Sequence, residues 1–160
     1  MTGFAHLADA GGRLAEVLSA ASADLREACL VAIIPNGVPV AEAVADALDL
    51  PLLGAGLDRE GDPRVVDIPD VGGRTVIVVD DGVETGTAST LIGAALRRAG
   101  ATRLILAVPV CPREAEPALR AIYDEVVAVD RPLARRDLRW HYSTFDTIDE
   151  AEARRRLDAR

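Results

Sequence analysis

Short runs of apolar residues, separated by segments long enough for a helix, are the feature that most constrains the fold of this chain. The clearest runs lie in CLVAIIP at 29–35, TVIVVDD at 75–81, RLILAVPV at 103–110 and EVVAVD at 125–130. Runs that do not alternate with polar residues are typical of strands buried on both faces of a parallel sheet. We therefore expect an α/β fold with an open, mostly parallel sheet flanked by helices.

Helices are expected between these strands. Apolar residues at helical spacing predict a first helix over about 6–27, interrupted at Gly11-Gly12, and a second helix that ends near Asp49. Thr147 and Glu150 have the spacing of a capping box, which predicts the start of the last helix. The remaining helices are expected at about 87–99 and 113–122.

No repeat and no linker-like tract divides the 160 residues. LPLLGAGL at 50–57 predicts a further short strand, and RVVDIP at 64–69 predicts its hairpin partner. A chain of this length is ordinary for one domain. A single domain over 1–160 is therefore expected.

The charged residues exclude several classes of function. All 18 basic residues are arginine, which excludes a phosphate-loop NTPase and a Schiff-base enzyme, since both need a lysine. The net charge of −8 argues against a protein held to nucleic acid or to a membrane surface by general electrostatic attraction. There is no signal-peptide pattern and no apolar stretch of about 18 residues, so we expect a soluble cytoplasmic protein.

The cysteines and histidines do not form a metal-binding pattern. Cys29 and Cys111 lie among apolar residues and are expected to be buried free thiols, the alternative being a disulfide or a reactive thiol. His6 and His141 do not complete a zinc site with these distant cysteines. Any metal is expected to be magnesium, bound through the oxygens of a ligand.

The segment VIVVDDGVETGTAS at 76–89 has the composition of a ligand site. Asp80 and Asp81 follow a buried strand, and ligands of parallel sheets bind beyond the carboxyl ends of the strands. The turn at 84–89 offers backbone N–H groups and hydroxyls at a helix start, which is typical of a phosphate site. The acids would repel a phosphate, so we expect them to bind ribose hydroxyls, magnesium or both. Solvated acids and ordinary helix caps would explain each feature singly, but not their combination.

This segment resembles the phosphoribosyl-pyrophosphate (PRPP) motif of type I phosphoribosyltransferases. The resemblance extends to VAIIPNGVPVAEAVADALDLPL and RLILAVPVCP, and the ending WHYSTFDTIDEAE is similar to a poorly characterised bacterial subfamily of predicted phosphoribosyltransferases. It implies that Asp80 and Asp81 contact the ribose hydroxyls and hold Mg²⁺ indirectly, through the ligand or water. It also implies that the 5-phosphate is bound by the turn residues Thr85, Gly86, Thr87, Ala88 and Ser89.

The loop after the first strand would then receive the pyrophosphate. Where the subfamily usually has Arg-Gly-Gly, this chain has Asn36, Gly37 and Val38. Backbone N–H groups would have to make the contact. The subfamily also has a long basic insertion between the second strand and the PRPP motif, and this chain lacks it. The cations left in that segment are Arg59, Arg64 and Arg74, of which the first two are candidates for the missing charge.

The implied reaction transfers a 5-phosphoribosyl group from PRPP to a nitrogenous acceptor and releases pyrophosphate. Glu84 is a candidate general base toward that acceptor, which the sequence does not identify. The altered loops support a second hypothesis, a catalytically weak or inactive regulatory protein that binds PRPP or a nucleotide monophosphate. A third hypothesis is an interaction subunit.

A hood over the site is expected from the helix at about 6–27, from the tail at about 131–160 or from a partner chain, and a homo-oligomer is expected. The tail concentrates aromatic residues at Trp140, His141, Tyr142 and Phe145. Packing against the core or a partner subunit is the expected role of these rings. A stacking wall for a base, with His141 as a general base, is the alternative.

Overall fold

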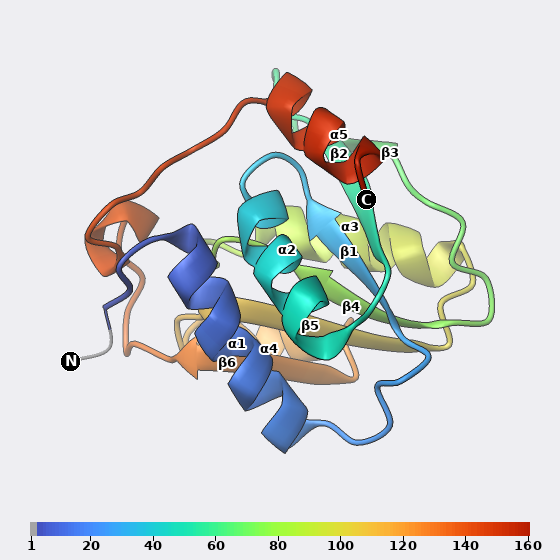
Figure 1. Cartoon of the computed structure of the whole chain (residues 1–160), viewed down its shortest axis with the longest axis horizontal. Coiled ribbons are helices and arrows are strands. Elements are labelled where there is room, and N and C mark those ends of the chain that lie inside the picture. Colours follow the sequence, from blue (N-terminus) through green and yellow to red (C-terminus); the bar gives the residue numbers. More distant parts are fainter. Residues whose placement is uncertain (1–2) are drawn as a thin grey trace.

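The computed structural model describes residues 3–160 and shows a six-stranded sheet between helices (Figure 1). Residues 1–2 of the expected domain lie outside the described residues. In chain order the elements are α1 (Leu7–Ala21), β1 (Cys29–Ile33), α2 (Gly37–Leu48), β2 (Leu52–Asp58), β3 (Arg64–Asp67), β4 (Thr75–Val79), α3 (Thr87–Arg98), β5 (Arg103–Val110), α4 (Glu116–Arg120), β6 (Glu125–Asp130), the 3-10 helix η1 (Leu138–His141) and α5 (Glu150–Asp158). Within residues 3–160, none of these helices is both long and apolar enough to cross a membrane.

The sheet has the strand order β3-β2-β1-β4-β5-β6. Neighbouring strands are parallel except for the hairpin of β2 and β3, which confirms the expected mostly parallel sheet and its hairpin. From β1 the chain proceeds to β2 on one side and then to β4 on the other, so the strand order changes direction between β1 and β4. Ligands of open α/β sheets bind at the carboxyl edge beside such a switch.

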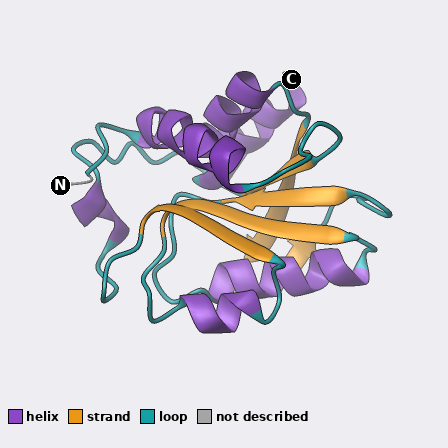
Figure 2. Ribbon diagram, turned by 90° about the horizontal axis from the view of Figure 1, so that it is seen from below, coloured by secondary structure: helices purple, strands orange, loops and turns teal. Residues whose placement is uncertain are grey.

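Each face of the sheet has its own layer of helices (Figure 2). The helices α1, α2 and α5 cover one face, and α3 and α4 cover the other. In β1, Leu30 and Ala32 face the first layer while Val31 and Ile33 face the second, and all four are fully buried. Burial on both faces explains why the strand sequences do not alternate with polar residues.

The first helix is shorter than the expected 6–27. His6 lies outside α1 as its N-cap, and its Nδ1 accepts a hydrogen bond from the backbone N–H of Asp9 at 3.0 Å. The helix ends before Ser22, where the backbone becomes extended.

The expected interruption of this helix at Gly11-Gly12 is wrong, because α1 is continuous there. A Cβ atom at Gly11 would lie 2.4 Å from the carbonyl oxygen of Val40 in α2. Glycine at this position therefore serves the close packing of two helices and does not break either of them.

Two other helices begin or end differently from expectation. The N-cap of α5 is Asp149, whose Oδ1 accepts a hydrogen bond from Glu152 N at 2.8 Å, so the predicted capping box of Thr147 and Glu150 is wrong. The helix α4 covers five residues of the expected 113–122, because the chain forms a turn before it.

The expected tail at about 131–160 divides into an irregular segment, residues 131–149, and the helix α5. From here on, the word tail refers to residues 131–149 alone. The tail pairs with the first described residues: Phe4 N donates to the His141 carbonyl at 2.8 Å, and Ser143 N donates to the Phe4 carbonyl at 2.8 Å. The rings of Phe4 and Tyr142 are in contact, with centroids 5.4 Å apart. Segments from opposite ends of the described chain therefore lie side by side at the carboxyl edge of the sheet (Figure 1).

Candidate functional site

A pair of buried carboxylates lies where the strand order changes direction. Asp80 and Asp81 directly follow β4 and are 9% and 8% exposed. Asp80 Oδ1 accepts a hydrogen bond from Asp81 N at 2.9 Å. The start of α2 packs against this turn, since a Cβ atom at Gly37 would lie 2.7 Å from the Val79 carbonyl oxygen. A larger residue at position 37 would push the two loops apart.

Burial governs the ionisation of this pair. It raises the pKa of Asp80 well above its usual range, and repulsion from Asp81 raises it further. Burial also raises the pKa of Asp81. The guanidinium of Arg59 opposes both pKa shifts. Carboxylates deprived of water in this way are stabilised by hydroxyl donors or by a cation.

The turn after the pair presents backbone N–H groups at the start of α3. Gly86 is the N-cap and has a φ of +88°, a conformation that favours glycine. The Thr85 and Thr87 hydroxyl oxygens lie 3.1 Å apart at the exposed surface of the turn. The first turn of α3 contains no acidic residue. The N–H groups of a first helical turn have no partner within the helix, so this turn and the positive end of the helix dipole suit a phosphate.

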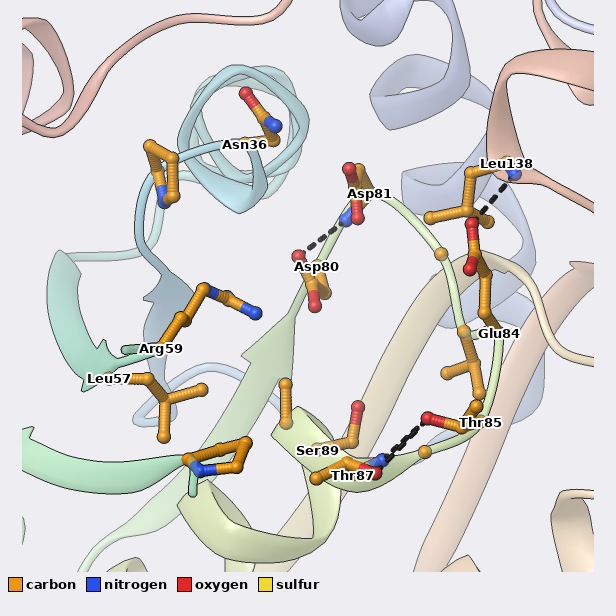
Figure 3. A pocket seen from close by; sticks show the side chains of 16 residues that line it. Asn36, Leu57, Arg59, Asp80, Asp81, Glu84, Thr85, Thr87, Ser89 and Leu138 are labelled. Carbon is orange, nitrogen blue, oxygen red and sulfur yellow. Dashed lines mark hydrogen bonds between the residues drawn. The ribbon is translucent and has the colours of Figure 1, made fainter. Parts of the chain in front are cut away.

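A cavity of about 520 Å³ joins the carboxylate pair to this turn (Figure 3). The expected site residues on its wall are Asn36, Asp80, Asp81, Glu84, Thr85, Gly86, Thr87, Ala88 and Ser89. Gly37 and Val38 are buried beside this wall and are not part of it. The N–H of Val38 donates to the Pro35 carbonyl at 3.2 Å, so this expected pyrophosphate contact is already engaged within the protein.

An arginine from the hairpin of β2 and β3 supplies positive charge to the cavity. Arg59 lies on the side of the cavity that faces away from Glu84 (Figure 3). Arg64 instead pairs with Asp58 at 3.1 Å. The structure thus separates two arginines that sequence spacing left equivalent. Among the lining residues within 3–160, Arg59 is the one cation.

The tail forms the opposite wall, through a residue that the sequence did not single out. The Leu138 side chain lines the cavity, and its backbone N–H donates to Glu84 Oε1 at 3.0 Å (Figure 3). Of the two segments of this chain expected as a hood, it is the tail that reaches the cavity within residues 3–160. One oxygen of Glu84 is therefore committed to holding the tail.

Two further hydrogen bonds connect the tail to the site. The Tyr142 hydroxyl donates to the Asp81 carbonyl oxygen at 2.7 Å. The backbone N–H of Ile148 donates to Asn36 Oδ1 at 3.0 Å. The tail therefore touches the carboxylate turn and the loop after β1 as well as Glu84.

The aromatic residues of the tail divide into buried and exposed positions. Tyr142 and Phe145 pack against the core, as expected, with ring centroids 5.1 Å apart. Trp140 is 61% exposed, and the Arg136 guanidinium lies over its ring, with Cζ 4.6 Å from the ring centroid. His141 is buried, and burial lowers its pKa. None of these five side chains lines the cavity within residues 3–160, so a stacking wall and a histidine base receive no support.

Both cysteines are buried and free, as expected from their apolar neighbours. Burial raises the pKa of both thiols, that of Cys111 to about 11. Thiols held protonated in this way are unreactive core residues.

The comparison with known families identifies this arrangement. Residues 5–135 match the family model described as the phosphoribosyl transferase domain. The chain belongs to the phosphoribosyl transferase domain family. The family resemblance expected from the sequence is confirmed, and membership supports phosphoribosyl transfer in general terms.

Several solved structures have the same fold as this chain. TT1426 from Thermus thermophilus is 22% identical, with a TM-score of 0.83 and 97% of both chains covered. A purine phosphoribosyltransferase from Pyrococcus horikoshii is 19% identical, with a TM-score of 0.59 and coverage of 89% of this chain and 93% of the other. A hypoxanthine-guanine phosphoribosyltransferase from Bacillus anthracis is 13% identical, with a TM-score of 0.58 and coverage of 90% and 92%. These likenesses establish an α/β fold of the phosphoribosyltransferase type.

The carboxylate pair of this phosphoribosyl transferase domain is chemically suited to magnesium. Within residues 3–160, no group of three or more His, Cys, Asp or Glu residues is placed to hold a metal ion. Magnesium, however, commonly keeps several waters and binds through one or two carboxylates together with substrate phosphates. Asp80 and Asp81 fit that mode, because they offer carboxylate oxygens beside a turn suited to phosphate.

Proposed function

We propose that this protein transfers a 5-phosphoribosyl group from PRPP to a nitrogenous acceptor, with release of pyrophosphate. The observation that carries the proposal is the presence, in one cavity, of the buried Asp80–Asp81 pair and the helix-start turn at 84–89. Ribose 5-phosphate carries the matching groups, hydroxyls that donate hydrogen bonds and a phosphate that accepts them. Membership of the phosphoribosyl transferase domain family supports the same class of reaction.

Substrate binding follows from the chemistry of these groups. The 5-phosphate accepts hydrogen bonds from the turn between Thr85 and Ser89, where the helix dipole also favours its charge. The ribose hydroxyls donate to the carboxylates of Asp80 and Asp81, replacing the water that burial removes. Asp80 and Asp81 would also hold magnesium, through ligand oxygens or water, and the ion would supply positive charge to offset that of the diphosphate.

The diphosphate lies on the side of Asn36 and Arg59. Asn36 contributes the polar backbone of the loop after β1, and the guanidinium of Arg59 contributes the positive charge. A guanidinium binds phosphate oxygens in a bidentate manner. Of the two arginines that were candidates for the missing charge, Arg59 is therefore the one that takes this role.

Transfer then requires one bond to break and one to form at C1 of the ribose. The C1–oxygen bond breaks, and its electron pair leaves with the pyrophosphate. The lone pair of the acceptor nitrogen forms the C1–nitrogen bond. Positive charge developing on the ribose is stabilised by the carboxylates of Asp80 and Asp81. Glu84 accepts the proton that the acceptor nitrogen loses, in an orientation fixed by the Leu138 N–H.

Calorimetric titration of PRPP, with and without magnesium, tests this proposal. Wild-type protein is expected to bind PRPP in a magnesium-dependent manner, and the Asp80→Asn/Asp81→Asn double variant is expected to lose that binding. Asp158→Asn is the matched control, because Asp158 is an exposed carboxylate in α5. Wild-type protein that binds neither PRPP nor ribose 5-phosphate would contradict the proposal.

A regulatory protein with the same binding site is the second hypothesis, since Arg59 is the one cation on the cavity wall within residues 3–160. Release of pyrophosphate from PRPP, assayed with a panel of nitrogenous acceptors, separates the two. PRPP binding with pyrophosphate release supports the enzyme. Tight binding without release for any acceptor supports the regulatory protein.

A further inference from the structure

The two sides of the cavity have different chemistry, and this difference bears on the acceptor. In a displacement at C1, the nitrogen approaches from the face opposite the leaving pyrophosphate. In Figure 3, Asn36 and Arg59 lie on one side of the Asp80–Asp81 pair, and Glu84 and Leu138 lie on the other. Given the proposed function, on which this inference rests, the acceptor therefore binds on the side of the cavity lined by Glu84 and Leu138.

The wall on the acceptor side combines an apolar surface with a fixed carboxylate. The Leu138 side chain lies directly over Gly82, where a Cβ atom would come within 2.5 Å of Leu138 Cδ2. Glu84 Oε1 accepts the Leu138 N–H, and no hydrogen bond within residues 3–160 engages Oε2. The second oxygen of an oriented carboxylate is thus left for a ligand.

The arginines of the tail do not line this side of the cavity. Arg139 pairs with Asp137 at 2.9 Å, and Arg136 lies over the ring of Trp140. Neither arginine lines the cavity, and Arg59 lies on the far side, beyond the Asp80–Asp81 pair (Figure 3). Arg139 interacts with Glu84 electrostatically from outside the cavity, but its guanidinium is paired with Asp137. The wall on the acceptor side therefore carries the carboxylate of Glu84 and, within residues 3–160, no cation.

We propose that the acceptor is a nitrogen base without a carboxylate group, which donates an N–H to Glu84 while one face of its ring lies against Leu138. A carboxylate on the base would meet the like charge of Glu84 on a wall that, within residues 3–160, offers it no cation. Like charges brought together in a binding site oppose binding strongly and so select against the wrong partner.

Pairs of nucleotides that differ in one carboxylate provide the test. Orotidine monophosphate differs from uridine monophosphate by a ring carboxylate, and nicotinate mononucleotide differs from nicotinamide mononucleotide by a carboxylate in place of a carboxamide. Dissociation constants are measured by calorimetry, with ribose 5-phosphate as the reference that lacks a base. In each pair, the nucleotide with the carboxylate is expected to bind at least about tenfold more weakly.

Two variants assign this discrimination to the proposed residues. Glu84→Gln keeps an oxygen for the Leu138 N–H but removes the charge, so the ratio within each pair is expected to fall below about threefold. Leu138→Ala removes apolar contact and is expected to weaken all four nucleotides by about fivefold, with ribose 5-phosphate unchanged. Glu27→Gln, an exposed neutralisation that precedes β1 at the other edge of the sheet, should leave every ratio unchanged.

The outcomes separate this inference from the function on which it rests. If ribose 5-phosphate binds and the carboxylate-bearing member of either pair binds as tightly as its partner, the acceptor assignment is overturned and the proposed function stands. Ratios that persist in Glu84→Gln also overturn it. If ribose 5-phosphate itself does not bind, both the proposed function and the acceptor assignment are overturned.

Discussion

Two segments approach the cavity from opposite sides, and they are held in different ways. The tail is hydrogen-bonded to the site at Glu84, Asp81 and Asn36. At the tip of the β2–β3 hairpin, the Asp58 carboxylate accepts hydrogen bonds from Glu60 N and from the Arg64 guanidinium, both in the same hairpin. The acceptor side is thus built into the fold, whereas the leaving-group side depends on one arginine of an exposed hairpin. Changes in the tail should affect stability and binding together, and changes in the hairpin should affect binding alone.

The largest effect is expected at the carboxylates between the two segments. Asp80→Asn removes an acceptor for the ribose hydroxyls and should weaken ribose 5-phosphate binding by at least about tenfold. The same variant should be more stable than wild type at neutral pH, because it removes a buried charge. Calorimetry and thermal unfolding measure the two effects.

The direction of the pH dependence follows from the raised pKa values of Asp80 and Asp81. A carboxyl group with a raised pKa in the folded state binds more protons folded than unfolded, so wild-type stability falls as pH rises from about 4 through the raised pKa. The stability advantage of Asp80→Asn should therefore grow as pH rises over that range. The affinity of wild type for ribose 5-phosphate should instead fall as pH falls, because the pair becomes protonated. A variant that is less stable than wild type at every pH would contradict this account of the pair.

A smaller and more selective effect is expected in the hairpin. Arg59→Ala should weaken the binding of PRPP and pyrophosphate by about five- to tenfold, since hydrogen bonds to charged groups are lost. Ribose 5-phosphate affinity should fall by less than pyrophosphate affinity, because Arg59 acts on that ligand only through its charge beside Asp80 and Asp81. Arg64→Ala is the matched control, because Arg64 pairs with Asp58. An equal loss for ribose 5-phosphate and pyrophosphate would show that Arg59 acts on the whole site and not on the leaving group.

The smallest effect on binding is expected from a change in the tail, and the same change should also lower the stability of the protein. Tyr142→Phe keeps the ring but leaves the buried Asp81 carbonyl without its donor, which should lower the free energy of unfolding by about 1–2 kcal/mol. Ribose 5-phosphate binding should weaken by a few-fold, because the carboxylate turn loses a support. Chemical denaturation and calorimetry measure both. Full affinity in a destabilised variant would mean that the tail supports the fold without positioning the site.

The sequence predicted those parts of the fold and the site that depend on side-chain type. Strands buried on both faces need apolar residues throughout, so the sheet was evident from runs such as CLVAI in β1. The turn around Gly86 needs a residue that tolerates positive φ, and the acids before it stand out after an apolar strand. The family resemblance followed from that pattern.

Contacts made by the backbone left no such signal. Leu138 and Ile148 reach the site through their N–H groups, which almost any residue could provide, so the path of the tail across the cavity was not predictable. Likewise, the place of Arg59 at the cavity depends on the hairpin geometry, and Arg64 has the same side chain. The error at Gly11 has a related cause, because close helix packing and helix interruption both favour glycine.

The pairing of Phe4 with the tail also fixes an order of events during synthesis. Phe4 is synthesised well before its partner Tyr142, and at ribosomal speeds of about 5–20 residues per second the two are separated by a delay on the order of ten seconds. In the later part of that delay the acid pair and the phosphate turn are already synthesised, but the wall formed by Leu138 is missing. A nascent chain therefore acquires the Leu138 wall of the cavity only after the strands of the sheet have been synthesised.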